Sequence, residues 1–184
     1  MQFLNKLYKT NRTLLSDGNE VALNLINDSI PLKIHRFKSG TKSYDWTIPK
    51  KWIVNKGILK DLNGNVIVNS DDNILHLLNY SNSYTGIISI TELLEHVYYN
   101  KKMQNAIPYR TNYYSDNWGF CLSYNQVKNL TDEKYYVDID TEFVDGELLI
   151  GESTLKGKSD KEVILSSYYC HPNQINDGLS GVIL

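Results

Sequence analysis

Two residues near the end of the chain, His171 and Asp177, have side chains and a spacing that could bind a metal ion. An imidazole nitrogen and a carboxylate oxygen are ordinary zinc ligands, and a catalytic zinc has three protein ligands and a position open to water. A zinc ion bound in this way makes water a nucleophile near neutral pH. On these two residues alone an alternative stays open, in which His171 caps a strand and Asp177-Gly178 is an ordinary turn.

The segment before His171 predicts the strand that would present this side chain. Val163–Tyr169 is a continuous, largely apolar run, typical of a strand that is buried on both faces of a mostly parallel sheet. Open α/β sheets bind their ligands at the carboxyl ends of such strands, which is where His171 lies. The residues from Leu179 onward predict the start of a helix.

Periodicity predicts three further elements near the two ends of the chain. A capping carboxylate at Asp17 precedes a short amphipathic helix at about residues 18–27, and Leu32–Phe37 alternates as a strand does. Tyr135–Phe143 and Glu147–Leu155 alternate around Asp145-Gly146 and predict a hairpin.

The middle of the chain has short apolar runs separated by turn signals. Asn63-Gly64 predicts a type I′ hairpin, and Ile107–Tyr114 predicts a strand. Short helices are expected from near Ser89 or Thr91, and from Ser123 to Leu130. This change of pattern predicts an inserted β-rich domain at residues 39–129, within a core made of residues 1–38 and 130–184.

Four longer motifs carry a resemblance to known proteins, and they are Ser39–Trp52, Ile107–Cys121, Val163–His171 and Asn176–Gly181. The last two resemble the co-catalytic di-zinc aminopeptidases, in which a strand supplies the first histidine ligand. In those enzymes a loop of the form Asn/Ala-Asp-x-x-Ser-Gly supplies an aspartate that bridges both ions. The first two motifs resemble one aminopeptidase-like family that is associated with surface-polysaccharide biosynthesis.

The resemblance covers essentially all 184 residues and implies an α/β fold. The chain would form the N-terminal part of a zinc-aminopeptidase-like, mostly parallel sheet with a β-rich inserted domain. The implied activity is a zinc-dependent amide hydrolase that uses water bound between two zinc ions. Only His171 and Asp177 map onto metal ligands, so the other ligands and a glutamate general base would lie beyond Leu184. We therefore expect an N-terminal fragment that is inactive by itself.

One position departs from the pattern of the better-known di-zinc peptidases. Those enzymes have an aspartate two positions after the histidine, where it orients the imidazole ring, whereas this chain has Asn173 at that position. The residues that would surround the His171 ligand therefore depart from those of the better-known enzymes.

An aromatic cluster provides candidate substrate-binding residues. Tyr113, Tyr114 and Trp118 surround a glycine and could form one wall of a substrate cleft. Such clusters also pack in cores and domain interfaces, and that alternative stays open.

Composition argues against several classes of function. The formal net charge is -2 and neither sign forms a long block, which argues against a nucleic-acid partner or a membrane-binding patch. The apolar runs are far shorter than the roughly 20 residues that span a bilayer, and no secretion signal is visible. We therefore expect a cytoplasmic protein with reduced Cys121 and Cys170. The resemblance implies that it acts on a peptide or another amide-bearing small molecule.

The sequence also leaves a non-catalytic function open. A scaffold derived from a peptidase could bind carbohydrate or a protein partner through the β-rich insertion, because a shared fold does not guarantee a shared activity. The oligomeric state is not indicated by any sequence feature.

Overall fold

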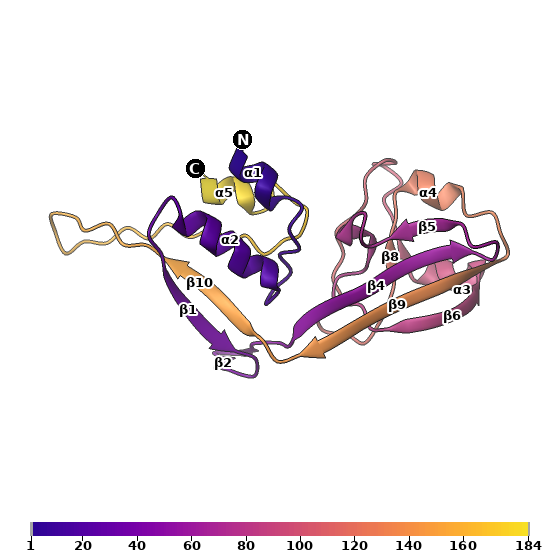
Figure 1. The fold of residues 1–184 in the computed structure, drawn as a ribbon, viewed down its shortest axis with the longest axis horizontal. Coiled ribbons are helices and arrows are strands. Elements are labelled where there is room, and N and C mark those ends of the chain that lie inside the picture. Colours follow the sequence, from indigo (N-terminus) through magenta and orange to yellow (C-terminus); the bar gives the residue numbers. More distant parts are fainter. Residues whose placement is uncertain (1, 184) are drawn as a thin grey trace. The chain divides into compact units, whose positions relative to one another are not determined.

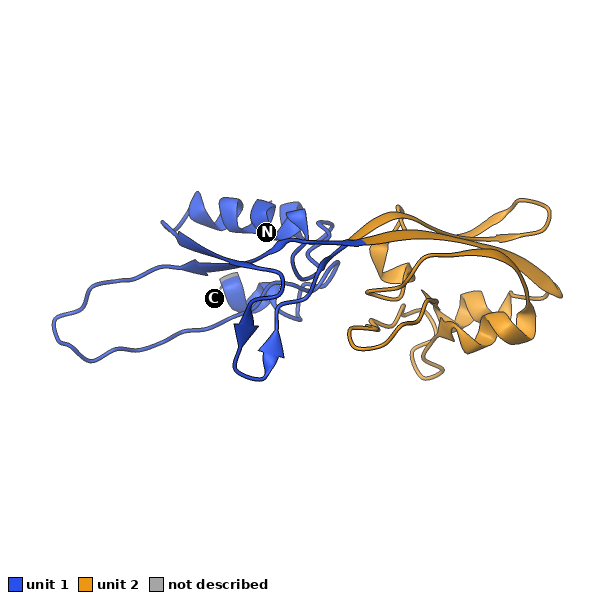
Figure 2. Ribbon diagram, turned by 90° about the horizontal axis from the view of Figure 1, so that it is seen from below, with its two compact units in different colours: residues 1–52, 143–184 blue, residues 53–142 orange. Residues whose placement is uncertain are grey.

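The structure, a computed structural model, describes residues 2–183 as two compact units. Unit 1 contains residues 1–52 and 143–184, and unit 2 contains the intervening residues 53–142 (Figure 2). No helix within residues 2–183 combines the length and the apolar character needed to cross a membrane. The two units are described separately below.

Three helices form the apolar core of unit 1. They are α1 (Gln2–Leu7), α2 (Asp17–Asn27) and α5 (Leu179–Ile183), and Figure 1 shows them grouped together. Leu7, Ala22 and Leu179, one from each helix, are fully buried against one another. Ala22 and Leu25 of the predicted apolar stripe face this core, whereas Val21 is exposed. Both the helix predicted at 18–27 and the helix from Leu179 are confirmed.

A two-stranded antiparallel ribbon completes the regular structure around these helices. Strand β1 (Lys33–Lys38) pairs with β10 (Glu147–Glu152), in the register Lys33 opposite Glu152. A side chain at Gly151 would meet the Leu23 side chain at 2.8 Å, so α2 packs closely on β10 there. The short strands β2 (Lys42–Ser43) and β3 (Trp46–Thr47) form a separate small hairpin.

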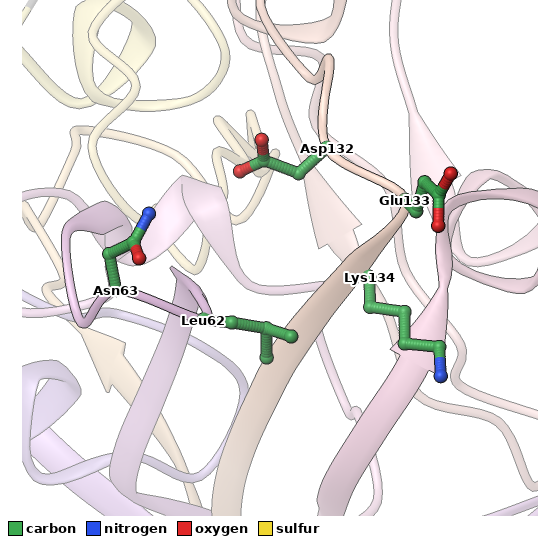
Figure 3. A pocket seen from close by; sticks show the side chains of 5 residues that line it. All are labelled: Leu62, Asn63, Asp132, Glu133 and Lys134. Carbon is green, nitrogen blue, oxygen red and sulfur yellow. The ribbon is translucent and has the colours of Figure 1, made fainter.

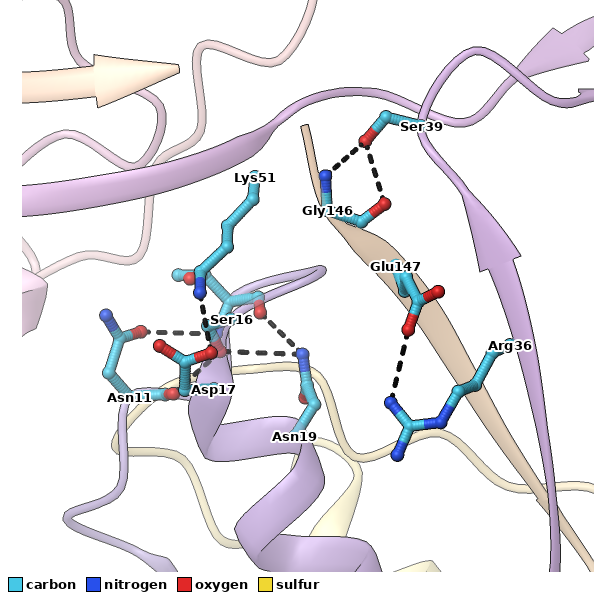
Figure 4. Close-up of polar contacts among 10 residues, drawn as sticks. Asn11, Ser16, Asp17, Asn19, Arg36, Ser39, Lys51, Gly146 and Glu147 are labelled. Carbon is cyan, nitrogen blue, oxygen red and sulfur yellow. Dashed lines mark hydrogen bonds and ion pairs between the residues drawn. The ribbon is translucent and has the colours of Figure 1, made fainter. Parts of the chain in front are cut away.

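Polar contacts link the start of α2 to Lys51 and link β1 and the residue after it to β10 and the residue before it (Figure 4). Lys51 Nζ donates to Asp17 Oδ1 at 2.5 Å, and Arg36 Nη1 pairs with Glu147 Oε2 at 3.2 Å. The Ser39 hydroxyl accepts from the main-chain N–H of Gly146 at 2.9 Å.

Unit 2 is built on a four-stranded antiparallel sheet in the order β5-β4-β9-β6. Its strands are β4 (Lys51–Asp61), β5 (Val66–Asn69), β6 (Tyr84–Ser89) and β9 (Lys134–Val144). The predicted hairpin at Asn63-Gly64 is confirmed as the β4–β5 connection. Of the two residues Asn63 and Gly64, only Gly64 has a positive φ, +90°, whereas a type I′ turn requires a positive φ at both. The connection is therefore the Leu62–Asn65 loop, and the predicted type I′ turn was wrong.

Short elements complete unit 2. They are η1 (Ile74–His76), α3 (Ile90–Glu95), β7 (Val97–Tyr98), β8 (Phe120–Cys121) and α4 (Tyr124–Lys128), with β7 and β8 paired in parallel. Ser89 caps α3, which settles the helix start that the sequence left between Ser89 and Thr91. Ser123 caps α4 as predicted, and it does so through a reciprocal capping box with Gln126. The strand predicted at Ile107–Tyr114 was wrong, because only Thr111 makes an isolated bridge.

The fold is mixed α/β, but its sheets are small and mostly antiparallel, so the expected mostly parallel sheet is not seen in the described residues. Val163–Tyr169 forms neither helix nor strand there, and Val163, Ile164 and Leu165 are 89%, 84% and 94% exposed. Both the strand and the burial predicted for this apolar run were therefore wrong. Burial of such a run requires neighbouring strands, and none of the described strands pairs with it.

The boundaries of the two units differ from the predicted domain boundaries. Unit 2 begins at Ile53 instead of residue 39, so the β2–β3 hairpin belongs to unit 1, in which Ser39 N donates to Gly146 O. It extends to Glu142 instead of residue 129, because β9 pairs with β4 and β6. For the same reason β9 and β10 belong to different sheets, and the hairpin predicted around Asp145-Gly146 was wrong.

Candidate functional site

The candidate site lies in unit 1, on the loop that leads from the apolar run into α5. The turn at Gly178 folds this loop back, with a φ of +112° that residues with side chains rarely adopt. A Cβ atom on Gly178 would lie 2.4 Å from the main-chain oxygen of Tyr168. Glycine is therefore required on two counts, and it lets the Asp177 turn lie directly against Tyr168.

The turn brings together the two residues that the sequence singled out. His171 Nδ1 lies 3.1 Å from Asp177 Oδ2, and the two side chains are 24% and 48% exposed. If each donor bound one zinc ion at about 2.05 Å, this separation would correspond to an angle of about 98° at the ion, near the tetrahedral value. The donor types and their separation fit two ligands of one zinc ion.

Tyr168 forms the third side of this pair. Its hydroxyl donates a hydrogen bond to Asp177 Oδ1, and its ring packs edge-on against the His171 ring with centroids 5.2 Å apart. The hydrogen bond to the Asp177 carboxylate raises the pKa of Tyr168, so the phenol keeps its proton and remains a donor. Tyr168 thus orients the carboxylate through one oxygen while the other oxygen faces His171.

Arg12 hydrogen-bonds to the main chain of the same loop, and it was not identified from the sequence. Its side chain is fully buried, and Nη2 donates to the main-chain oxygen of His171 at 2.6 Å. No local pattern indicates this contact, because 159 residues separate the partners. The one available signal was the rarity of arginine, since the chain has three arginines and sixteen lysines.

Cys170, next to His171, is a free cysteine, as is Cys121. Burial raises the pKa of the Cys170 thiol above its usual value. A nucleophilic cysteine requires a lowered pKa and the thiolate form. Cys170 therefore lacks the features of a cysteine nucleophile.

The aromatic candidates lie in unit 2. Trp118 is 9% exposed and stacks between Tyr84 and His96, with ring centroids 4.1 and 3.9 Å away. Tyr113 packs edge-on against Tyr114 at 4.7 Å, and Tyr114 is 85% exposed. This geometry favours packing for Trp118, while Tyr114 presents its ring to solvent.

Two other features of the described residues provide no second candidate site. Within residues 2–183, no group of three His, Cys, Asp or Glu side chains is placed to hold a metal ion. A hollow on unit 2 is lined by Leu62, Asn63, Asp132, Glu133 and Lys134, next to the β4–β5 loop (Figure 3). Its lining has no histidine or cysteine to act as a metal ligand or nucleophile.

Comparison with known proteins adds a family to these observations. Residues 51–142 match a family described as a domain of unknown function, DUF2172. A Clostridium acetobutylicum protein is 36% identical over 181 residues, which are 98% of this chain and 42% of that protein. Its name provisionally assigns it to polysaccharide biosynthesis, with an aminopeptidase-like domain.

Two solved structures were also found. A C. acetobutylicum crystal structure, named provisionally as a peptidase, has a TM-score of 0.91 and 35% identity, covering 98% of this chain and 43% of its own. An aminopeptidase from Aneurinibacillus sp. strain AM-1 has a TM-score of 0.44 and 9% identity, covering 87% of this chain and 48% of its own. The second likeness is too low to define a shared fold. The chain spans 42–43% of the length of its C. acetobutylicum relatives.

Proposed function

The chain belongs to the DUF2172 family, and from its relatives and its site we propose that it is part of a zinc-dependent, aminopeptidase-like amide hydrolase. The observation that carries the proposal is the 3.1 Å separation of His171 Nδ1 and Asp177 Oδ2. The names of the two C. acetobutylicum relatives, which include a peptidase and an aminopeptidase-like domain, support the reaction class.

In this proposal His171 and Asp177 hold the metal, with Asp177 shared between two zinc ions. When bound, zinc would polarise the carbonyl group of the substrate and lower the pKa of a bound water molecule. Tyr168 orients the Asp177 carboxylate through its hydroxyl, and Gly178 allows the turn that places this carboxylate beside His171.

The proposal requires residues outside these 184. Two donors are fewer than the three protein ligands of a catalytic zinc, so further ligands and the general base must come from other residues of the complete protein. The substrate is an amide. Because one relative's name refers to polysaccharide biosynthesis, acylated sugars are to be assayed beside aminoacyl substrates.

The decisive experiment is a zinc titration of the complete gene product by calorimetry. We expect Asp177→Ala to weaken zinc binding more than about a hundredfold and to abolish amide hydrolysis, because it removes a ligand to the ion. The matched control is Asp160→Ala, which removes an exposed carboxylate of the same segment and leaves both quantities unchanged. Equal zinc affinity in the two variants would disprove the site.

The 184-residue chain alone provides a second test. With only two of the expected ligands, we expect no amide hydrolysis and a thermal midpoint that added zinc does not move. The complete protein should instead show a zinc-dependent rise that Asp177→Ala abolishes. Tight stoichiometric binding by the short chain would mean that the ligand set is local and that the split site is wrong.

A further inference from the structure

The Arg12 guanidinium makes an unusual set of contacts for a cation with no exposed surface. An arginine side chain carries five N–H donors in a fixed planar arrangement. In this structure each of the five has a main-chain carbonyl oxygen as its partner. The acceptors are the oxygens of Leu7, Thr10, Tyr169, His171 and Gln174.

Three of these five hydrogen bonds go to the loop that carries His171. Arg12 Nε donates to Tyr169 O at 2.8 Å, and Nη2 donates to His171 O at 2.6 Å and to Gln174 O at 3.1 Å. The acceptors therefore lie on both sides of His171 and on His171 itself. The other two bonds join the guanidinium to the end of α1 and the turn after it.

The loop depends on such contacts because residues 170–176 form neither helix nor strand, and Asn173 has a φ of +51°. Because such a loop lacks the main-chain hydrogen bonds of a helix or sheet, its buried carbonyl groups need donors from elsewhere in the protein. The guanidinium fork supplies three of them from one rigid group, which sets the path of the main chain on both sides of His171.

Burial of the cation disfavours its charged form and lowers the pKa of Arg12. The five charge-assisted hydrogen bonds offset this desolvation. A lysine at this position would have its three donors on a single nitrogen atom. From there they could not reach all the carbonyl groups that the three nitrogens of the guanidinium reach.

We propose that Arg12 is a positioning residue for the metal pair: by binding the main chain around His171, it holds the imidazole at the distance from Asp177 that a shared ion requires. The role in metal binding rests on the proposed function. The five hydrogen bonds of Arg12 go to main-chain oxygens, so its effect on the ion acts through the His171 main chain.

Arg12 also ties α1 to the loop, so its loss will lower stability, and the test has to separate the two effects. The variants are Arg12→Lys, which keeps the charge, and Arg12→Gln, which removes the charge and tolerates burial better if the lysine variant does not fold. The matched control is Leu25→Ala, which weakens the same core cluster and removes none of the hydrogen bonds to the loop.

Two measurements are made on the complete gene product, well below every thermal midpoint. The first is Co²⁺ affinity, with the visible absorption of bound cobalt as the report on ligand geometry. The second is hydrogen exchange of residues 170–178 in the metal-free protein. We expect the Arg12 variants to bind Co²⁺ about tenfold to a hundredfold more weakly, with altered absorption bands and faster exchange in the loop. Leu25→Ala should match the wild type in all three.

The possible failures are distinguishable. Wild-type Co²⁺ affinity, absorption and loop exchange in an Arg12 variant would overturn the positioning role. Equal losses in Leu25→Ala and the Arg12 variants would also overturn it, since the effect would then be general destabilisation. If the wild-type protein binds no Co²⁺, the proposed function fails, and the exchange data alone decide whether Arg12 positions the loop.

Discussion

The hydroxyl of Tyr168 donates to one oxygen of Asp177 while the other oxygen lies 3.1 Å from His171 Nδ1. An aspartate that bridges two ions needs both oxygens, so an ion that takes Oδ1 has to displace the hydroxyl. The tyrosine and aspartate side chains are each about half exposed, which makes this hydrogen bond weaker than a buried one to a charged group.

We therefore expect Tyr168→Phe in the complete protein to tighten the second of two zinc-binding steps by about threefold to tenfold and to leave the first step unchanged. Calorimetric titration resolves the two steps. Tyr44→Phe is the control, because Tyr44 is fully exposed. Weaker binding in the second step would show that the hydroxyl assists the ion instead of competing with it.

Gly178 gives the second prediction. Gly178→Ala places a Cβ atom 2.4 Å from Tyr168 O on a backbone whose φ is +112°, so both the contact and the conformation are strained. We expect a loss of at least about 2 kcal/mol in the free energy of unfolding, measured by denaturant titration, together with weaker zinc binding.

Gly157→Ala is the matched control for this substitution. Gly157 lies in the same chain segment of unit 1, residues 143–184, and a Cβ atom there meets nothing within 4 Å. Its stability should stay within about 0.5 kcal/mol of the wild type. If Gly178→Ala is equally neutral, the turn adapts easily and does not position Asp177.

The sequence predicted best the features that depend on neighbours in the chain. Ser123 was identified as a helix cap, and Ser89 as one of two possible helix starts, because a cap bonds to an N–H group only three residues later. His171 and Asp177 were paired for a similar reason, since six residues containing a turn are enough to bring them together. Gly64 marked the β4–β5 connection because of its positive φ.

Features that depend on distant partners were not predictable in this way. Val163–Tyr169 has the apolar pattern of a buried strand, but the pattern cannot show which strands would cover it. Alternation before and after Asp145-Gly146 was equally clear, yet β9 and β10 pair with strands far away in the sequence. Arg12 was missed because its three loop acceptors are more than 150 residues away.

The aromatic cluster of unit 2 gives a prediction that separates packing from substrate binding. Trp118 lies between two stacked rings and is nearly buried, so Trp118→Ala should lower the free energy of unfolding by about 3 to 5 kcal/mol. Tyr114→Ala should change it little, because that side chain is 85% exposed. Denaturant titration measures both variants.

The same pair tests the cleft-wall hypothesis. If Tyr114 contacts the substrate, Tyr114→Ala should raise the KM for amide hydrolysis by the complete protein while its stability remains that of the wild type. An unchanged KM would leave Tyr114 as a surface residue. A Trp118→Ala variant as stable as the wild type would contradict the packing role.

Cys121 gives a prediction about pH. Burial in β8 raises the pKa of this thiol to about 12, so the folded chain keeps a proton that the unfolded chain loses near the ordinary cysteine value. The stabilisation is fully present below that ordinary value and is lost as the pH rises toward 12. Over this window the free energy of unfolding should fall by about 1.4 kcal/mol per pH unit from this group.

The measurement compares the wild type with Cys121→Ala by denaturant unfolding at pH 8 and pH 10.5, in reducing buffer. Tyrosines, lysines and Cys170 titrate in both proteins, so their contributions cancel in the difference. We expect the wild type to lose about 2 kcal/mol more than the variant between these two pH values, because only the wild type buries this thiol. Equal losses would mean that the Cys121 thiol ionises as readily in the folded chain as in the unfolded one, and that strand β8 opens to water at alkaline pH.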